Sequence, residues 1–179
     1  MPTAMKNMIT DTYLQLLERR NIDKITVKDL VDACGISRQT FYYHFRDIFE
    51  VIDWSIERKM QQVLKQSLEQ PTKEQAIRIF VEAAVESHAA VARGLNSQKR
   101  ECIEAVFLQV LNTYLLTIFR KKAPRVFIDP AEEDVVVQFC SGGIAHLLLN
   151  HCKSENTDID QLTQQLCRLL TAARATLES

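Results

Sequence analysis

Residues that stop helices and form tight turns are rare in this chain, and their scarcity constrains its fold more than any other feature. Glycine and proline number only four each among 179 residues. A β-sandwich or β-barrel needs such residues at its many turns, whereas a helical chain needs few of them. Apolar residues instead recur at spacings of three and four along most of the sequence, as they do on one face of a helix. The sequence therefore predicts an all-α fold.

Composition indicates a folded chain without a strong overall electric field. The chain is 46% hydrophobic and 25% charged, and its 22 Lys and Arg against 23 Asp and Glu give a net charge of −1. Attraction to nucleic acid or to a membrane therefore has to come from a local surface. The longest nearly apolar stretch, 135–149, contains polar residues and is shorter than the roughly 20 residues that span a bilayer. Because the N-terminus also lacks the pattern of a secretory signal, we expect a cytoplasmic protein without a membrane segment.

The cysteines are expected to be reduced, buried thiols rather than metal ligands or disulfides, because they form no C-x-x-C pair and mostly occupy apolar helical positions. They are Cys34, Cys102, Cys140, Cys152 and Cys167. The only cluster with metal-ligand character combines Cys140 and Cys152 with His146 and His151. At helical spacing Cys140 and His151 share a face, but the other two point elsewhere. We therefore expect no metal site.

Helix boundary signals near the N-terminus predict three short helices. Thr26 and Asp29 have the spacing of a capping box, which would start the second helix. Gly35 is placed to end that helix in the left-handed conformation, and Ser37 is placed to cap a third helix directly afterwards. Two short helices joined by a turn of about three residues that contains glycine are the outline of a helix-turn-helix.

The third of these helices, 37–45, is predicted to expose a surface rich in hydrogen-bond donors, since the apolar residues of the three helices can form a small core. That core would contain Ile25, Val27, Leu30, Val31, Ile36, Phe41 and Phe45. The polar residues left outside are Arg38, Gln39, Thr40, Tyr42, Tyr43 and His44. Such side chains suit base edges and phosphates, and the first 46 residues hold seven Lys or Arg against five Asp or Glu. On the pattern alone, aromatic core packing and a helix-turn-helix that binds no DNA remain alternatives.

The stretch from Ile25 to Phe45, ITVKDLVDACGISRQTFYYHF, resembles the DNA-binding signature of the TetR-type (TetR/AcrR) transcriptional regulators. The resemblance covers roughly residues 5 to 55. It implies a homodimer whose two recognition helices enter successive major grooves of a pseudo-palindromic operator in double-stranded DNA. Such a regulator is usually a repressor that a small-molecule effector releases. Carried over by position, the residues facing bases would be Arg38, Gln39, Thr40 and Tyr43, and those holding the phosphate backbone would be Thr26, Lys28, Tyr42 and His44.

One position departs from the family pattern. Where the family commonly has a phosphate-binding lysine at the start of the fourth helix, this chain has Ile48. Arg46 can compensate, or the N-terminus of the fourth helix with Asp47 as its cap. An aspartate beside a phosphate would itself be unfavourable. DNA affinity or register can therefore differ from the family norm.

The chain is predicted to divide into a DNA-binding domain, 1–46, and a helical ligand-binding and dimerisation domain, 47–179. The second domain contains patterns for five helices. One of them is expected to break near His88, and another carries Gly142 and Gly143 in its middle. The predicted helices cover about 47–68, 72–94, 97–122, 129–149 and 158–177.

The two adjacent glycines predict a helix–helix contact. Each costs about 1 kcal/mol relative to alanine inside a helix unless the missing side chain lets another helix approach closely. We expect the last two helices to pair with their copies in a second subunit as a four-helix interface, which the family resemblance also implies. The alternative is that both helices pack within a monomer. Candidate interface residues are Gly142, Gly143, Leu147, Leu166, Leu169 and Leu170.

Catalytic motifs are missing from the sequence. It contains no G-x-G-x-x-G, P-loop, G-x-S-x-G, H-E-x-x-H or Glu-x-x-His pattern, so we expect neither an enzyme nor a cofactor. The resemblance implies an effector pocket among the middle helices, although core packing explains each candidate as well. These candidates are Trp54, His88, Cys102, Phe107, Tyr114 and His146. Two alternatives remain: a regulator of the same type that answers to a protein partner and can activate transcription, and a helical enzyme or carrier with a vestigial head.

Overall fold

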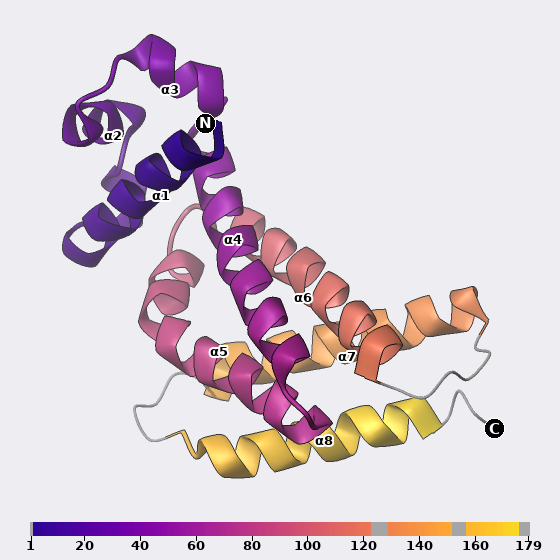
Figure 1. Ribbon diagram of the computed structural model, residues 1–179. Helices are drawn as coiled ribbons and strands as arrows, with labels where there is room; N and C mark the ends of the chain where they lie inside the picture. The colour runs from indigo at the N-terminus through magenta and orange to yellow at the C-terminus, as the bar shows by residue number, and fades with distance from the viewer. Residues whose placement is uncertain (1, 123–128, 152–156, 176–179) are drawn as a thin grey trace. The chain divides into compact units, whose positions relative to one another are not determined.

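The computed structural model describes residues 2–122, 129–151 and 157–175, and these residues confirm the all-α fold. They form eight α-helices and one 3-10 turn, with no strand (Figure 1). In chain order the elements are α1 (Pro2–Arg19), η1 (Ile22–Lys24), α2 (Val27–Cys34), α3 (Arg38–His44), α4 (Ile48–Glu69), α5 (Lys73–Leu95), α6 (Arg100–Lys122), α7 (Pro130–His151) and α8 (Ile159–Ala175).

Local capping fixes the helix-turn-helix as the sequence predicted. The Thr26 hydroxyl accepts the N–H of Asp29 at 3.2 Å, and the Asp29 carboxylate accepts the N–H of Thr26 at 2.9 Å. Gly35 ends α2 with φ 65°, in the left-handed region where glycine is favoured. Ser37 begins α3 by accepting the N–H of Thr40 at 3.0 Å. The three predicted boundary signals are therefore confirmed.

The structure departs from the predicted helix boundaries at three places. The turn η1 was not anticipated; it is held by Asn21, whose side chain accepts the N–H of Asp23 at 2.8 Å. The expected break near His88 was wrong, because α5 continues to Leu95 through a stretch rich in alanine, a strong helix former. Helix α6 begins at Arg100 rather than at Ser97, since the Ser97 hydroxyl donates back to the carbonyl of Gly94 within the preceding turn.

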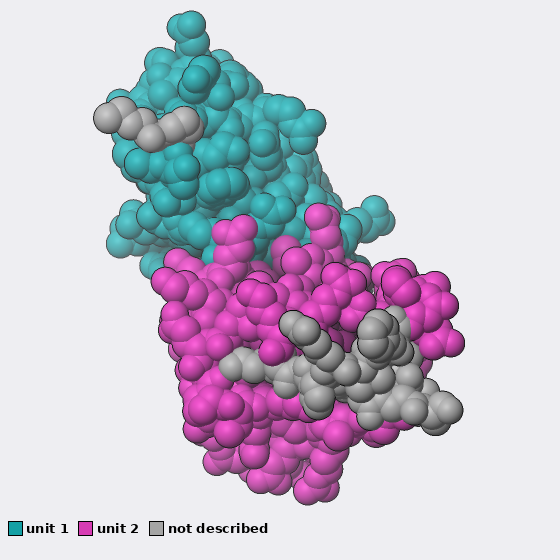
Figure 2. Space-filling view, turned by 45° about the vertical axis from the view of Figure 1, so that its right-hand side comes forward, with its two compact units in different colours: residues 1–58, 89–106 teal, residues 59–88, 107–179 magenta. Residues whose placement is uncertain are grey.

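The chain packs as two compact units (Figure 2). Unit 1 contains residues 1–58 and 89–106, and unit 2 contains residues 59–88 and 107–179. Helices α4, α5 and α6 each contribute residues to both units. The packing of unit 1 therefore extends beyond the predicted boundary at residue 46, whereas the division by function into 1–46 and 47–179 stays a prediction.

Unit 1 is built around the core that the sequence predicted for the three short helices. Five of the seven predicted core residues are buried, namely Ile25, Leu30, Val31, Phe41 and Phe45, and Val27 and Ile36 are partly buried against them. Ile9, Tyr13 and Leu17 of α1 join this core, as do Val51 and Ile52 of α4 and Ile103 of α6. Residues from the second segment of unit 1 thus complete the core around the helix-turn-helix.

Unit 2 is a bundle formed by the later part of α4, parts of α5 and α6, and the helices α7 and α8. Tyr114 lies at its centre, where its ring stacks on Phe80 with centroids 4.9 Å apart and its hydroxyl donates to Ser67 and to the carbonyl of Ala76. Burial raises the pKa of Tyr114 to about 12. Among the described helices, one stretch of α6, Arg100–Lys121, is long and apolar enough to cross a membrane, and it contributes buried residues to the cores of both units.

Candidate DNA interface

Helix α3 turns its polar residues outward because two aromatic residues one turn apart anchor its inner face. Phe41 and Phe45 are 0% and 1% exposed and lie in the core of unit 1. On the outer side Tyr42 and Tyr43 are 56% and 80% exposed, in spite of their large apolar rings. Arg38 and Gln39 are also exposed, and Thr40 and His44 are half-buried. The structure thus brings six of the predicted site residues together on one short helix.

Ring contacts brace the two exposed tyrosines. Tyr42 meets Phe41 edge to face with centroids 5.4 Å apart, and Tyr43 meets His44 in the same way at 5.0 Å. Such perpendicular pairs are favourable for aromatic rings. Both tyrosines stay exposed while they make these ring contacts.

Thr40 has a hydroxyl that is already engaged. Its Oγ1 lies 2.9 Å from Oγ of Ser37, the residue that caps the same helix. The methyl group of Thr40 is thus the part of this side chain that remains for a new contact. A threonine methyl can meet the methyl group of a thymine.

The start of α2 carries the other two predicted site residues, Thr26 and Lys28. Lys28 is exposed. The Thr26 hydroxyl donates to the Asp29 carboxylate at 2.5 Å while it accepts the N–H of Asp29, so both of its hydrogen-bonding roles are taken. Arg20 binds the same carboxylate at 2.6 Å. Hydrogen bonds from the Thr26 side chain and backbone, followed by the one from Arg20, lower the pKa of Asp29 to about 2.

The ion pair between Arg20 and Asp29 was not predicted. The capping box is a local pattern, readable from a spacing of three residues, whereas Arg20 reaches Asp29 from the preceding helix end, nine residues earlier. It partly balances a carboxylate that lies next to predicted phosphate contacts. No carboxylate lies on α3 itself.

Residues 9–52, which contain this surface, match the model of the family described as bacterial regulatory proteins, tetR family. These residues therefore form a DNA-binding domain of the TetR type. The resemblance drawn from the residues of α2 and α3 is thereby confirmed. The curated proteins compared with the chain gave no match.

Solved structures share the TetR-type fold along nearly the whole chain. The dihydroxyacetone kinase operon activator DhaS is 18% identical with a TM-score of 0.69, covering 97% of this chain and 98% of its own. A tetR-family transcriptional regulator from Streptomyces coelicolor is 17% identical with a TM-score of 0.62, covering 96% and 83%. The TetR family repressor AlkX from Dietzia sp. strain DQ12-45-1b is 17% identical with a TM-score of 0.59, covering 97% and 98%. At these identities the likeness concerns the fold.

The residues proposed to line an effector pocket are divided between the two units. Trp54 and Cys102 belong to unit 1, and His88, Phe107, Tyr114 and His146 belong to unit 2. Trp54 donates to Asn7 at 3.3 Å, and the Cys102 thiol contacts the Asp53 carboxylate at 3.7 Å. Burial raises the pKa of that thiol and of that carboxyl. His146 is on an exposed face of α7. The pocket stays a prediction.

Some of the residues proposed for the dimer interface are exposed on α7 and α8, and others are buried beneath these helices. Gly142 and Gly143 are exposed, and a Cβ built on either of them would meet no atom within 4 Å. Leu169 is exposed, Leu147 is half-buried, and Leu166 and Leu170 are buried in the core of unit 2. Within the described part of the chain, no other segment therefore uses the space that the two glycines leave open.

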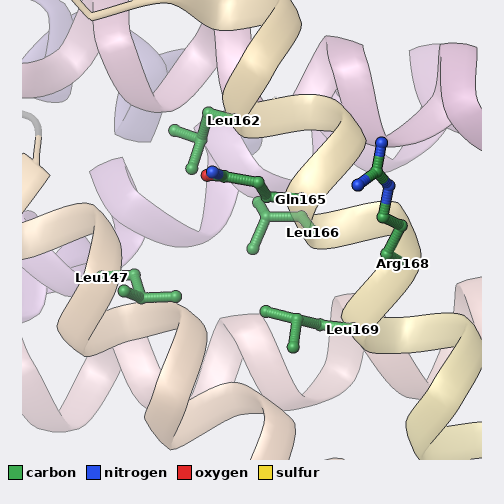
Figure 3. A pocket seen from close by; sticks show the side chains of 6 residues that line it. All are labelled: Leu147, Leu162, Gln165, Leu166, Arg168 and Leu169. Carbon is green, nitrogen blue, oxygen red and sulfur yellow. The ribbon is translucent and has the colours of Figure 1, made fainter.

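A surface groove of about 350 Å³ runs between α7 and α8 (Figure 3). Its lining residues are Leu147, Leu162, Gln165, Leu166, Arg168 and Leu169. Farther along α7, Val135 and Phe139 are 67% and 81% exposed, and neither was predicted as a site residue. Their spacing of four residues continues to Gly142, Gly143 and His146, which gives α7 an outward face containing both apolar side chains and glycines.

Cys152 and the side chain of His151 lie outside the described residues, so the expectation of no metal site in that cluster stays a prediction. The four described cysteines, Cys34, Cys102, Cys140 and Cys167, are half-buried free thiols.

Proposed function

We propose that the chain is a homodimeric repressor that binds a pseudo-palindromic operator through α3 and is released by a small-molecule effector. The observation that carries this proposal is the outer surface of α3, where polar and tyrosine side chains stay exposed over the buried anchors Phe41 and Phe45. Exposed, braced tyrosines have no role in the core of the protein, whereas they suit contacts in a DNA groove.

Each side chain of the surface has a proposed role. Gln39 can bond an adenine edge with both the oxygen and the NH2 of its side-chain amide, and the Thr40 methyl can meet a thymine methyl. Arg38 and Tyr43 would also face bases. Tyr42, His44 and Lys28 would hold phosphates. Thr26, whose hydroxyl and backbone N–H both donate to Asp29, would act there by fixing the start of α2.

A homodimer would bring two such helices to half-sites about one helical turn, or a multiple of it, apart. We propose the outward face of α7 and the groove beside α8 as its interface. Val135, Phe139 and Leu169 are apolar and exposed there, and the glycines leave room for a second helix. Burying such a patch against a second copy removes apolar surface from water.

Effector binding would act by a shift between two populations of the dimer that differ in the separation of their recognition helices. Helix α4 is one continuous element that begins directly after the helix-turn-helix and ends in unit 2, so a displacement in unit 2 can reach the DNA-binding surface through it. The regulator would act in the cytoplasm, where its operator is accessible. We propose no enzymatic activity.

A second candidate function is a TetR-type regulator that answers to a protein partner and activates transcription. The specific observation in its favour is the likeness to DhaS, described as an operon activator, which extends over 98% of that chain. The two candidates share the DNA-binding surface and differ in the sign of regulation.

The test is selection of bound duplexes from a random DNA pool by the purified full-length protein. Enrichment of a two-fold symmetric site is expected, and a folded protein that enriches no site would contradict the proposal. On the enriched site, Gln39→Ala should cost about 1 to 3 kcal/mol in binding and little on random DNA. Gln15→Ala on the exposed side of α1 is the matched control, with no loss expected. Transcription from a template carrying the site then separates repression from activation.

A further inference from the structure

The N-terminus of α4 is already occupied by the chain's own carboxylates. Asp47 accepts the N–H of Glu50 at 3.0 Å, and Glu50 accepts the N–H of Arg46 at 2.7 Å. The N–H of Glu50 in the first turn of α4 and the N–H of Arg46 just before it are therefore satisfied. The two negative charges also oppose a phosphate at this end of the helix. The sequence suggested two phosphate contacts in place of the lysine that the family has at position 48, namely Arg46 and the N-terminus of the fourth helix. The helix N-terminus is thus the weaker of the two.

Glu50 joins three segments of unit 1. Its Oε2 lies 3.5 Å from Nε of Arg46, and its Oε1 lies 3.8 Å from Nζ of Lys6 on α1. The Lys6 ammonium in turn lies 4.9 Å from the centre of the Phe45 ring and 4.6 Å from that of Trp54. Cations favour such positions over aromatic rings. The carboxylate therefore ties the link after α3 to α1 and α4.

The two cations bound to Glu50 differ in accessibility. The side chain of Lys6 is 23% exposed, whereas that of Arg46 is 86% exposed. Arg46 comes directly after Phe45, the C-cap residue of α3, so its backbone lies at the end of that helix. The contact with Glu50 is made through Nε, and the terminal amino groups of a guanidinium can bind two oxygens of one phosphate.

We infer that Arg46 is the DNA phosphate contact that replaces the absent lysine, and that Glu50 is the positioning residue that orients it. The inference rests on the DNA-binding function proposed above. In this assignment, the phosphate contact at the link between α3 and α4 is a cation that a carboxylate orients, rather than a helix N-terminus.

The test measures binding of a fluorescent random-sequence DNA duplex by the full-length protein at KCl concentrations between 50 and 200 mM. Neutralising one phosphate contact changes the slope of log K against log salt by about 0.9. Arg46→Gln should therefore make the slope shallower by about 0.9 for each bound protomer. The wild-type affinity then falls about 3.5-fold more than that of the variant over this fourfold rise in salt for one bound protomer, and about 12-fold more for the proposed dimer. Arg46→Lys should retain the wild-type slope.

Arg100→Gln is the matched control. Arg100 is also in unit 1, is 63% exposed and pairs with a glutamate four residues later, so the two variants lose the same charge from the same kind of ion pair. The control should keep the wild-type slope. If Arg46→Gln, folded by circular dichroism, matches Arg100→Gln, the role of Arg46 is overturned while DNA binding stands. If the wild type itself binds no duplex, the proposed function fails with it.

A double-mutant cycle tests the positioning role of Glu50. Glu50→Gln alone removes a negative charge as well as the orienting contact, so only the coupling between the two changes is informative. In the Glu50→Gln background, Arg46→Gln should cost less affinity than it does in the wild type. An equal cost in both backgrounds would show that Arg46 acts without Glu50.

Discussion

Asp29 illustrates how a single carboxylate can fix a helix start and still be accommodated next to the surface proposed to bind DNA. It closes the capping box with Thr26 and is paired with Arg20. The spacing of Thr26 and Asp29 was readable from the sequence because a cap is a contact between near neighbours. The sequence did not predict that Arg20 pairs with Asp29 or that Lys6 pairs with Glu50, because these ion pairs depend on how α1 packs against α2 and α4.

The lowered pKa of Asp29 gives a prediction about acid stability. The carboxyl has a pKa of about 2 in the folded protein against an ordinary value of 3.8. Because the folded value is the lower one, the ionised group stabilises the fold above pH 3.8, and this contribution disappears as the pH falls towards 2. We expect wild type to have a larger free energy of unfolding than Asp29→Asn at about pH 6, with the two converging at low pH. Urea denaturation at a series of pH values measures this, and a constant difference would contradict it.

At the scale of elements, the junction between α5 and α6 is attached to the turn between α1 and α2. The N–H of Gln98 donates to Asp23 at 3.1 Å, and Nζ of Lys99 donates to the carbonyl of Ile22 at 3.2 Å. The sequence predicted most helix boundaries but neither η1 nor this attachment. Boundaries follow from caps, glycines and prolines within a few residues, whereas the attachment joins residues about 75 positions apart.

Lys99→Met should destabilise the protein although it keeps most of the aliphatic chain. The Lys99 side chain is only 11% exposed and also lies 3.5 Å from the Asp23 carboxylate. Loss of a charged hydrogen bond in such surroundings costs roughly 1.5 to 3 kcal/mol of unfolding free energy. Lys59→Met is the matched control, because the pair of Lys59 with Glu86 is exposed and contributes at most about 1 kcal/mol. Urea denaturation that finds equal effects would show that the attachment adds no stability.

At the scale of the whole molecule, the question of dimer or monomer depends on whether a second chain covers the exposed face of α7. The Gly142-Gly143 pair predicted a close helix contact, and the described residues of the chain place no atom near it. By contrast, a Cβ at Gly94 would lie 2.7 Å from Cδ1 of Ile103. The sequence could thus mark the glycines as special but could not distinguish a neighbour in the same chain from one in another. It also assigned Leu166 and Leu170 to the interface, whereas both are buried in unit 2.

Gly143→Leu is expected to convert the proposed dimer to monomers. A leucine has room within the protomer and is a better helix former than glycine, so the fold itself should gain rather than lose stability. Loss of dimer would therefore be due to a second chain. Sedimentation velocity of the full-length protein measures the change, with Gln109→Leu at an exposed position of α6 as the control. A tight dimer formed by Gly143→Leu would exclude this face as the interface.

The discontinuous core of unit 1 has a consequence for the order of events during protein synthesis. Ile103 is 7% exposed and belongs to the same core as Leu30 and Phe41. The ribosome adds about 5 to 20 residues per second, so the segment from residue 46 to residue 106 takes roughly 3 to 12 s to make. In a nascent chain, α3 is therefore synthesised several seconds before the start of α6. Only when α6 has been made is the hydrophobic core under α3 complete. Premature termination in this interval would leave a DNA-binding surface on an unfinished core.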